Sequence, residues 1–265
     1  MRPILFTLGG LAIPAYATFL TLALLLSWPL TLGSAGDAPI VETLLGLLGT
    51  TAGSILGARL LHEAVNPRAS GERRQWLRFD GGMMAMGGFL GGALGAVLLV
   101  SARGGDVLGF FDAGAPAMAL GLAVARVGCL LKGCDFGRPL SSLSRLPGIR
   151  FPSWRARYPG LREAGSPAYL EHLRQGLVGS QATQSARCHP VQLYWSAAGL
   201  LTLGWLLATP QPGRFLRFMF AYSVLSFGLE LLRGDRDRGA WRGLSTTQWL
   251  SIPIACGSAS ALVWG

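Results

Sequence analysis

The chain of 265 residues is unusually apolar, because 51% of its residues are hydrophobic and only 14% are charged. Soluble domains carry about 25% charged residues. A composition this apolar excludes an intrinsically disordered chain, and four cysteines are too sparse for a disulfide-stabilised scaffold. The composition therefore predicts an integral membrane protein.

The chain is also basic, with 23 lysines and arginines against 13 aspartates and glutamates, and Lys132 is its single lysine. Arginine binds phosphate through two parallel hydrogen bonds. Anionic lipid headgroups are the simplest partners for a basic membrane protein, and no nucleic-acid-binding motif accompanies the charge. We therefore expect contact with the lipid bilayer and its anionic phospholipids, and none with nucleic acid.

Seven apolar segments approach the length of about 20 residues that a helix needs to cross a bilayer. They cover residues 11–31, 40–61, 82–101, 108–131, 190–208, 214–233 and 244–264. No signal-peptide cleavage site follows the first segment, so we expect it to remain as a span. The predicted fold class is an all-α integral membrane protein with seven transmembrane helices and a small extramembrane head.

The head is predicted from the connection between the fourth and fifth spans, which is the longest of the chain. Residues 132–189 hold nine lysines and arginines, several prolines and glycines, and one amphipathic stretch around residues 168–177. We therefore divide the chain into three regions. Residues 1–131 carry spans one to four, residues 132–189 form the head, and residues 190–265 carry spans five to seven.

Glycines recur in the third span at four-residue steps, at Gly87, Gly91 and Gly95, and again at Gly88 and Gly92. This spacing leaves one helix face bare, so that the backbone of another helix can approach closely. Helix packing is the simpler interpretation. The alternative is that Gly87 and Gly88 also make room for a lipid chain or headgroup.

Two of the ionisable residues inside apolar segments are the strongest candidates: Arg126 near the end of the fourth span and Glu230 near the end of the sixth. A charge inside the bilayer is costly, which makes each a candidate for function. The structural alternative is an Arg126–Glu230 ion pair that only holds two spans together. Arg138 and Arg233 lie near the same membrane face, either as part of a phosphate pocket or in an interfacial belt of arginines.

Cysteines and a histidine follow Arg126 in the sequence. A metal site from Cys129, Cys134, Cys188 and His189 has unusual ligand spacing, so we predict neither a metal nor another cofactor. A Cys129–Cys134 or Cys134–Cys188 disulfide needs an oxidising compartment, and unpaired buried thiols are the simpler alternative. His189 either transfers a proton or orients the start of the fifth span.

Five motifs follow one another along the chain. They are LGGLAIPAY at 8–16, FDGGMMAMGGFLGG at 79–92, ARVGCLLKGCDFGRP at 125–139, HPVQLY at 189–194, and FGLELLRGD at 227–235 together with LSTTQWLSIP at 244–253. In this order they resemble the prolipoprotein diacylglyceryl transferases of bacterial inner membranes. The resemblance implies the fold of that family over most of the chain.

The resemblance also implies a reaction, in which the diacylglyceryl group of phosphatidylglycerol moves to the cysteine thiol of a lipoprotein precursor and glycerol phosphate leaves. Such a reaction needs a base near the thiol and positive charge near the leaving phosphate. The residues that match family positions are Tyr16, Arg126, Gly137, Tyr222, Glu230 and Arg233. Predicted catalytic residues are Arg126, Cys134, His189 and Glu230; predicted substrate-binding residues are Tyr16, Gly87, Gly88, Cys129, Gly137, Arg138, Tyr222 and Arg233.

The chain departs from the family pattern at four positions, where the family has His, Asn, Glu and Arg and this chain has Met86, Cys129, Cys134 and Ser226. Met86 cannot carry a proton, so another group must act as the base. Cys134 is preferred because it replaces a carboxylate, and a positive neighbour would favour its thiolate. Cys129, Asp135 and His189 are the other candidates.

These departures leave two further functions open. One is another phospholipid headgroup transferase that uses the cysteine-rich site, and the other is a non-catalytic protein that binds lipid or lipoprotein. The positive-inside rule assigns the arginine-rich face to the cytoplasm, whereas the resemblance implies an active site open to the periplasm. We follow the resemblance and expect a multi-pass inner-membrane protein with its active site facing the periplasm.

Overall fold

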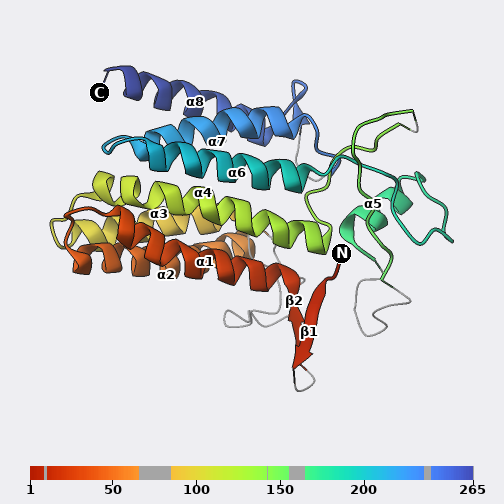
Figure 1. The fold of residues 1–265 in the computed structure, drawn as a ribbon, viewed down its shortest axis with the longest axis horizontal. Coiled ribbons are helices and arrows are strands. Elements are labelled where there is room, and N and C mark those ends of the chain that lie inside the picture. The colour runs from red at the N-terminus through yellow and green to blue at the C-terminus, as the bar shows by residue number, and fades with distance from the viewer. Residues whose placement is uncertain (9–10, 66–84, 142, 155–164, 236–239, 265) are drawn as a thin grey trace. The chain divides into compact units, whose positions relative to one another are not determined.

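The structure is a computed structural model that describes residues 1–8, 11–65, 85–141, 143–154, 165–235 and 240–264. The described helices are α1 Ala15–Ser34, α2 Ile40–Val65, α3 Ala85–Ser101, α4 Val107–Lys132, α5 Pro167–Arg174, α6 Val191–Ala208, α7 Arg214–Glu230 and α8 Thr246–Trp264 (Figure 1). The strands β1 Ile4–Leu8 and β2 Leu11–Pro14 form one antiparallel hairpin, and β3 Ala240–Trp241 and β4 Leu244–Ser245 form another.

Each of the seven predicted spans overlaps one long helix, so the helical class is confirmed. Helices α1, α2, α4 and α6 are long and apolar enough to cross a membrane, and α3 is apolar but shorter. These helices support a membrane protein, and crossing by all seven helices stays a prediction. The predicted start of the third span at 82–84 and the motif residues 79–84 lie outside the described residues, as do Gly265 and residues 155–164 of the head.

The first span was predicted from residue 11, and this boundary is wrong. Residues 11–14 form strand β2, which pairs with β1 before α1 begins at Ala15. Ile13 precedes Pro14, and a residue before proline is biased toward an extended backbone. The amide of Ala15 then donates to the carbonyl of Pro3 at 2.8 Å, which closes the hairpin against the helix start.

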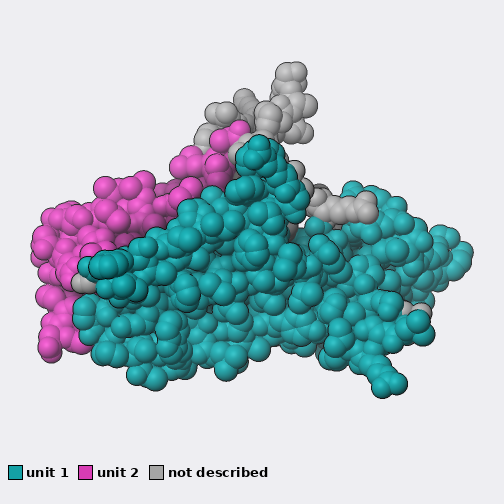
Figure 2. Space-filling view, turned by 90° about the horizontal axis from the view of Figure 1, so that it is seen from above, with its two compact units in different colours: residues 1–27, 115–265 teal, residues 28–114 magenta. Residues whose placement is uncertain are grey.

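The chain divides into two compact units, Met1–Ser27 with Ala115–Gly265 and Trp28–Gly114 (Figure 2). In the first unit α6, α7 and α8 lie side by side (Figure 1). Helix α4 packs against α6 through small residues, because a Cβ added at Gly199 would lie 2.9 Å from the Ala119 carbonyl oxygen. The Ser196 hydroxyl donates to the Ala123 carbonyl at 3.0 Å across the same contact.

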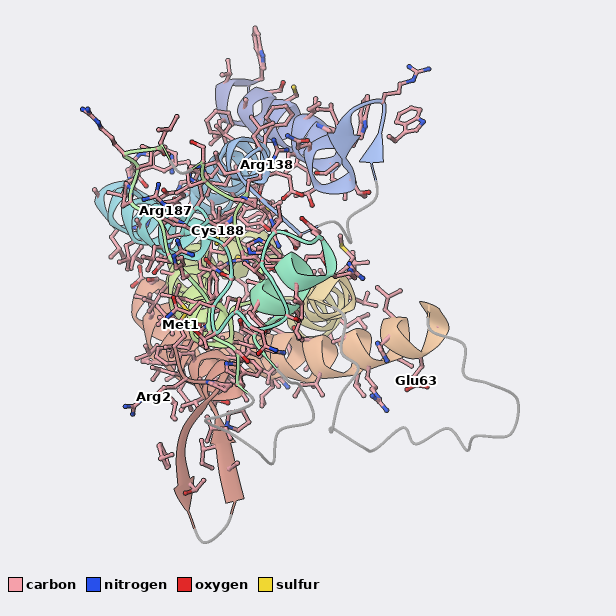
Figure 3. The ribbon with its side chains drawn as sticks, turned by 90° about the vertical axis from the view of Figure 1, so that its right-hand side faces the viewer. Met1, Arg2, Glu63, Arg138, Arg187 and Cys188 are labelled. Atoms are coloured by element: carbon pink, nitrogen blue, oxygen red, sulfur yellow. The ribbon has the colours of Figure 1, made fainter. Side chains whose placement is uncertain are left out.

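Residues between α4 and α6 fold into a small cluster at the end of this helical layer (Figure 1). Its buried centre consists of Phe136, Phe151, Ala168 and Cys188. Two head segments, which carry Arg138 and Cys188, pair antiparallel through Pro139 and Cys188 (Figure 3). Helix α5 lies within the stretch predicted to be amphipathic, and Ser166 caps it by accepting a hydrogen bond from the Tyr169 amide. The head therefore has a small core of its own.

The second unit is held by close packing of α2 on α3. A Cβ added at Gly53 would collide with the carbonyl oxygen of Gly91, and one added at Gly91 would collide with that of Gly53. Gly87 faces Gly57 in the same way, and a Cβ at Gly88 would lie 3.5 Å from the Ser54 carbonyl oxygen. The glycine repeat of α3 therefore serves helix packing, and lipid contact by Gly87 and Gly88 stays a prediction.

We expect Gly53→Ala to lower the thermal unfolding midpoint of the protein in detergent. The added methyl group forces α2 and α3 apart, and overpacking of this kind costs about 1–3 kcal/mol. Gly114→Ala in α4 is the matched control, because no described atom lies within 4 Å of its added Cβ. That control should keep or slightly raise the midpoint, since alanine favours helix. Equal midpoints for the two variants would contradict the packing interpretation.

Candidate functional site

The candidate site is organised around the carboxylate of Asp135, in the loop that follows α4. Its Oδ2 accepts a hydrogen bond from Arg126 Nη1 at 2.7 Å, and its Oδ1 accepts one from Arg233 Nη2. Asp135 adopts a positive φ of 54°, a conformation that Asp tolerates better than most residues. Through this carboxylate the last part of α4 is tied to the segment that follows α7.

Arg233 is the most enclosed cation of the site, with only 4% of its side chain exposed. Asp235 accepts from its Nε at 2.9 Å and from its Nη2 at 2.7 Å, and a Glu230 carboxylate oxygen lies 3.9 Å from its Nε. Arg233 also donates a hydrogen bond to Asp135, so three carboxylates surround its guanidinium group. Arg233 is therefore a permanently charged centre for several carboxylates.

The backbone on both sides of this ion-pair network is fixed by two close glycines. Gly137 pairs with Arg233 as an antiparallel bridge, and a Cβ at Gly234 would lie 2.5 Å from the Gly137 carbonyl oxygen. A Cβ at Gly137 would lie 2.6 Å from the Cβ of His189. The Nε of Arg138 donates to the Arg233 carbonyl at 3.2 Å. Gly137 therefore supports the site by close approach, and it brings Arg138 and His189 to the same place.

An aromatic wall from α6 and α7 accompanies Arg126. The Arg126 guanidinium carbon lies 5.2 Å from the Trp195 ring centroid, and the Trp195 and Tyr222 rings are 5.6 Å apart. Trp195 is buried, and its indole Nε1 has no hydrogen-bond partner among the described residues. Trp195 was not predicted from the sequence as a site residue, although this residue directly follows the HPVQLY motif. Because 17% of the Arg126 side chain is exposed, this cation is more accessible than Arg233.

Tyr16 reaches the site from α1. The Lys132 ammonium lies 5.4 Å from the Tyr16 ring centroid. Helices α1 and α4 approach closely here, because a Cβ at Gly128 would lie 3.3 Å from the Cα of Tyr16. Tyr16 thus lies next to the Lys132 cation, and Tyr222 lies next to Trp195, which contacts Arg126. Both tyrosines were predicted to bind substrate.

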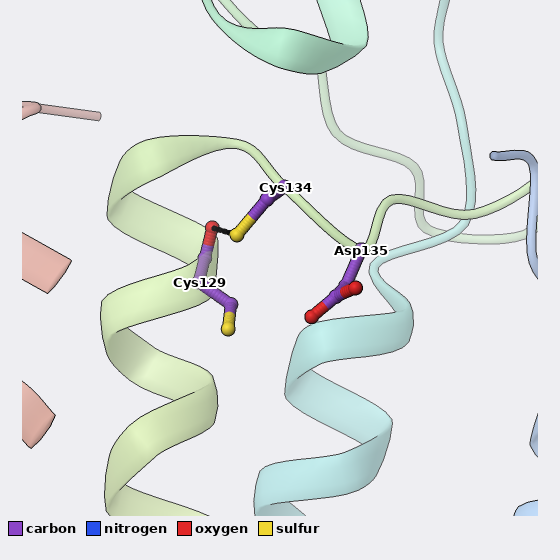
Figure 4. Close-up of side chains that lie close together, drawn as sticks. All are labelled: Cys129, Cys134 and Asp135. Atoms are coloured by element: carbon purple, nitrogen blue, oxygen red, sulfur yellow. Dashed lines mark hydrogen bonds between the residues drawn. The ribbon is translucent and has the colours of Figure 1, made fainter. Parts of the chain in front are cut away.

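The thiols of Cys129 and Cys134 and the carboxylate of Asp135 lie within 4.8 Å of one another (Figure 4). The three groups could in principle hold a metal ion, but both oxygens of Asp135 already accept hydrogen bonds from arginines. The cationic surroundings oppose a further positive ion. This donor set fits a metal poorly, and the absence of a metal remains the prediction.

The pKa of the Cys134 thiol lies below its usual range. A hydrogen bond from the Cys129 thiol is the largest cause, and the positive charges of Lys132 and Arg126 add to it. Burial and the Asp135 carboxylate oppose the shift. Burial raises the pKa of Cys188 to about 12, so this thiol stays protonated and hydrogen bonds to the Ile149 carbonyl.

A pocket of about 330 Å³ opens beside these groups. Its wall combines residues of the ion-pair network with one face of α5: Cys134, Asp135, Phe136, Pro167, Leu170, Glu171, Arg174 and Asp235. Cys134 thus connects the buried network with a space that a ligand can enter.

Comparison with known proteins identifies the family of the chain. The profile of the prolipoprotein diacylglyceryl transferase family matches residues 3–264. The chain belongs to the prolipoprotein diacylglyceryl transferase family. It is 29% identical to a phosphatidylglycerol–prolipoprotein diacylglyceryl transferase of Clostridium tetani over 95% of this chain and 93% of that protein. It is 31% identical to the Burkholderia ambifaria protein of the same name, over 83% of this chain and 76% of the relative.

Several predicted residues of this diacylglyceryl transferase family member are brought together and others are not. Arg126, Cys129, Cys134, Arg138 and Arg233 meet around Asp135 and the segments beside it. The alternative Arg126–Glu230 pair is replaced by ion pairs of Arg126 with Asp135 and of Arg233 with Glu230. The roles of all these residues in catalysis stay predictions.

The predicted residue His189 and the departure from the family pattern at Met86 lie outside this group. His189 donates its backbone amide to the Arg138 carbonyl at 3.1 Å, and its ring Nδ1 is buried without a partner among the described residues. Met86 lies on α3 in the second unit with 48% of its surface exposed. A thioether carries no proton at neutral pH, so position 86 supplies no base in this family member.

We expect alkylation of Cys134 by iodoacetamide to have a midpoint below the pH of about 8.5 that is typical of a free cysteine. Only the thiolate reacts, so a lowered pKa moves the profile of rate against pH to lower values. Peptide mass spectrometry measures the modification at Cys134 alone. Cys129→Ala removes the thiol that hydrogen bonds to Cys134 and should move the midpoint upward. A midpoint at or above 8.5 in the unmodified protein would contradict the lowered pKa.

Proposed function

We propose that this protein transfers the diacylglyceryl group of phosphatidylglycerol to the cysteine thiol of a lipoprotein precursor. The names of its relatives state this donor and this acceptor for those proteins. The observation that carries the proposal is the pair Arg126 and Arg233 on one carboxylate, next to an open pocket. In the reaction the acceptor sulfur forms a bond to the glyceryl carbon, the carbon–oxygen bond to phosphate breaks, and glycerol phosphate leaves.

Arg126 is the residue that we assign to the phosphate. Its contacts in the described structure are Asp135 and the Trp195 ring, whereas the Nε and Nη2 atoms of Arg233 are taken by carboxylates. Arg233 therefore holds Asp135 in place, and Asp135 orients Arg126. An arginine in this position stabilises the negative charge that grows on the leaving oxygen.

The base is assigned to Cys134, at the wall of the pocket. Its lowered pKa gives a thiolate that can accept the proton of the acceptor thiol. His189 is the second candidate, because its backbone lies against Arg138 and its Nδ1 has no described partner. Glu230 faces Arg233 and takes a positioning role in this proposal.

The membrane arrangement is part of the same proposal. Seven spans cross the bacterial inner membrane, four from residues 1–131 and three from residues 190–265. Residues 132–189 form an extramembrane head on the periplasmic face, where a lipoprotein precursor presents its cysteine. The head has a small hydrophobic core of its own, and this core packs against the end of α4 next to the site.

A non-catalytic protein that binds lipid or lipoprotein is the second candidate function. One observation favours it: position 86, where the family has a histidine, holds a methionine. In that function Arg126 still binds the phosphate of an anionic lipid. Transfer activity separates the two candidates, because only a transferase restores lipoprotein synthesis in a bacterium depleted of its own enzyme.

We expect the protein to complement such a depleted strain and Arg126→Gln to abolish complementation. Loss of a charge-assisted hydrogen bond weakens lipid binding by about 1.5–3 kcal/mol. Phosphatidylglycerol retained by the purified protein, measured by lipid mass spectrometry, should fall in parallel. Arg103→Gln is the control, because Arg103 is exposed in the connection between α3 and α4. Unchanged lipid content in Arg126→Gln would contradict the phosphate assignment; normal lipid binding without complementation would favour the non-catalytic function.

We expect the C-terminus to lie in the cytoplasm and the head in the periplasm. Alkaline phosphatase fused after residue 265 should be inactive, and a fluorescent protein at the same point should be bright. Alkaline phosphatase inserted after Gly179, in an exposed turn of the head, should be active. An active C-terminal phosphatase together with an inactive head insertion would reverse the orientation and agree with the positive-inside rule.

A further inference from the structure

Two thiols meet at the end of α4 because the chain turns back on itself there. The amide of Cys134 donates to the Cys129 carbonyl at 3.2 Å, and Gly133 allows the turn with a φ of 82°. The two sulfur atoms lie within 4.8 Å of each other (Figure 4). A disulfide bond is about 2.05 Å long, so the two side chains must rotate toward each other to join the sulfurs.

The two thiols are not equivalent in their surroundings. Cys129 lies in the last turn of α4 and is 5% exposed, whereas Cys134 forms part of the pocket wall. Lys132 and Arg126 lie near Cys134 and favour its thiolate. An accessible, activated thiol with a buried thiol behind it is the arrangement that thiol–disulfide exchange requires, since one sulfur attacks and the second resolves the mixed disulfide.

The other cysteines lack this arrangement. Cys188 is fully buried in the head core and its pKa is raised to about 12 by burial, so it is poorly reactive. Cys256 is exposed on α8 without a second described thiol beside it. Neither cysteine is joined in a disulfide, and the ion pairs of Asp135 with the two arginines do not use the sulfur atoms.

We propose that Cys129 and Cys134 form a thiol–disulfide exchange site that reduces a disulfide-bonded cysteine presented in the pocket. The Cys134 thiolate attacks one sulfur of that disulfide, forms a mixed disulfide and releases the other sulfur as a thiolate. The Cys129 thiol passes its proton to this thiolate and attacks the Cys134 sulfur. The second sulfur of the substrate then leaves as a thiolate and takes a proton from water. One disulfide is reduced to two thiols and the Cys129–Cys134 disulfide forms; a dithiol reductant returns the pair to its starting state.

The chemical class of the substrate rests on the proposed function. A cysteine acceptor can act as a nucleophile only as a free thiol, and a site in an oxidising compartment meets cysteines that have become disulfides. A dithiol whose Cys134 lines the pocket would restore that thiol at the place where it is used. The exchange chemistry itself requires no lipid, so it can be tested independently of transfer.

The test uses the full-length protein in detergent with Cys256→Ser as the background and glutathione disulfide as the probe. With both cysteines present, we expect two glutathiones to be released per protein and peptide mapping to find a Cys129–Cys134 disulfide. Cys129→Ala should instead accumulate glutathione bound to Cys134, because the resolving thiol is gone. Cys134→Ala should neither form an internal disulfide nor bind glutathione. Cys129→Ser is a second variant that keeps a polar side chain at position 129.

Three results would overturn the proposal. They are no internal disulfide in the background protein, no more mixed disulfide in either Cys129 variant than in the background, and stoichiometric zinc bound to the thiols of the purified protein. Transfer from phosphatidylglycerol to a reduced acceptor peptide is measured separately, with a phosphine reductant present. Failure of transfer with intact exchange would contradict the proposed function alone, and intact transfer without exchange would contradict this inference alone.

Discussion

The site depends on one carboxylate that two arginines share. Asp135 holds Arg126 through one oxygen and Arg233 through the other, although the two arginines are far apart in the sequence. Arg233 is the buried member, so removing Asp135 would leave its charge with fewer partners, which is far more destabilising than the pair itself is stabilising. The network therefore fixes the end of α4 against the segment after α7, and it keeps Arg126 oriented beside the aromatic wall.

The local backbone is shaped to deliver that carboxylate. Gly133 and Asp135 both have positive φ, and the turn they form points Cys134 toward the pocket and Asp135 toward the arginines. Gly137 and Gly234 then allow the backbone of the segment after α4 to contact the backbone of the segment after α7. A side chain at either glycine would push the segments apart and separate Asp135 from Arg233. The glycines act by letting the two segments approach closely, whereas the charged residues act through ion pairs and hydrogen bonds.

The long helices and Arg126 could be predicted from the sequence, whereas the N-terminal hairpin and the partner of Arg126 could not. Apolar runs gave the positions of the long helices, because hydrophobicity and length are local properties. The hairpin at residues 4–14 was missed because its residues are as apolar as a span, and only Pro14 indicated an extended backbone. Arg126 stood out as a charge among apolar neighbours. Its partner did not, because pairing with Asp135 rather than Glu230 depends on a turn with an unusual φ.

Two residues of the site, Trp195 and Asp235, were not predicted from the sequence. Trp195 contacts Arg126, which is distant in the chain, so no local pattern marks it. Asp235 sits two residues after Arg233 and could have been suggested by that spacing, since a following carboxylate can reach back to the guanidinium. Trp195 lies one position beyond the HPVQLY motif, so the match to that motif does not include it.

The charges of the site also fit the proposed reaction. Four cations, Arg126, Lys132, Arg138 and Arg233, lie with three carboxylates, Asp135, Glu230 and Asp235, so the cluster carries one surplus positive charge when Cys134 is protonated. A phosphodiester brings one negative charge, which this surplus neutralises. When the carbon–oxygen bond breaks, the departing phosphate monoester gains further negative charge. Because the cations are held in place before the reaction, they interact more strongly with the transition state than with the bound lipid, and this difference is what accelerates a reaction.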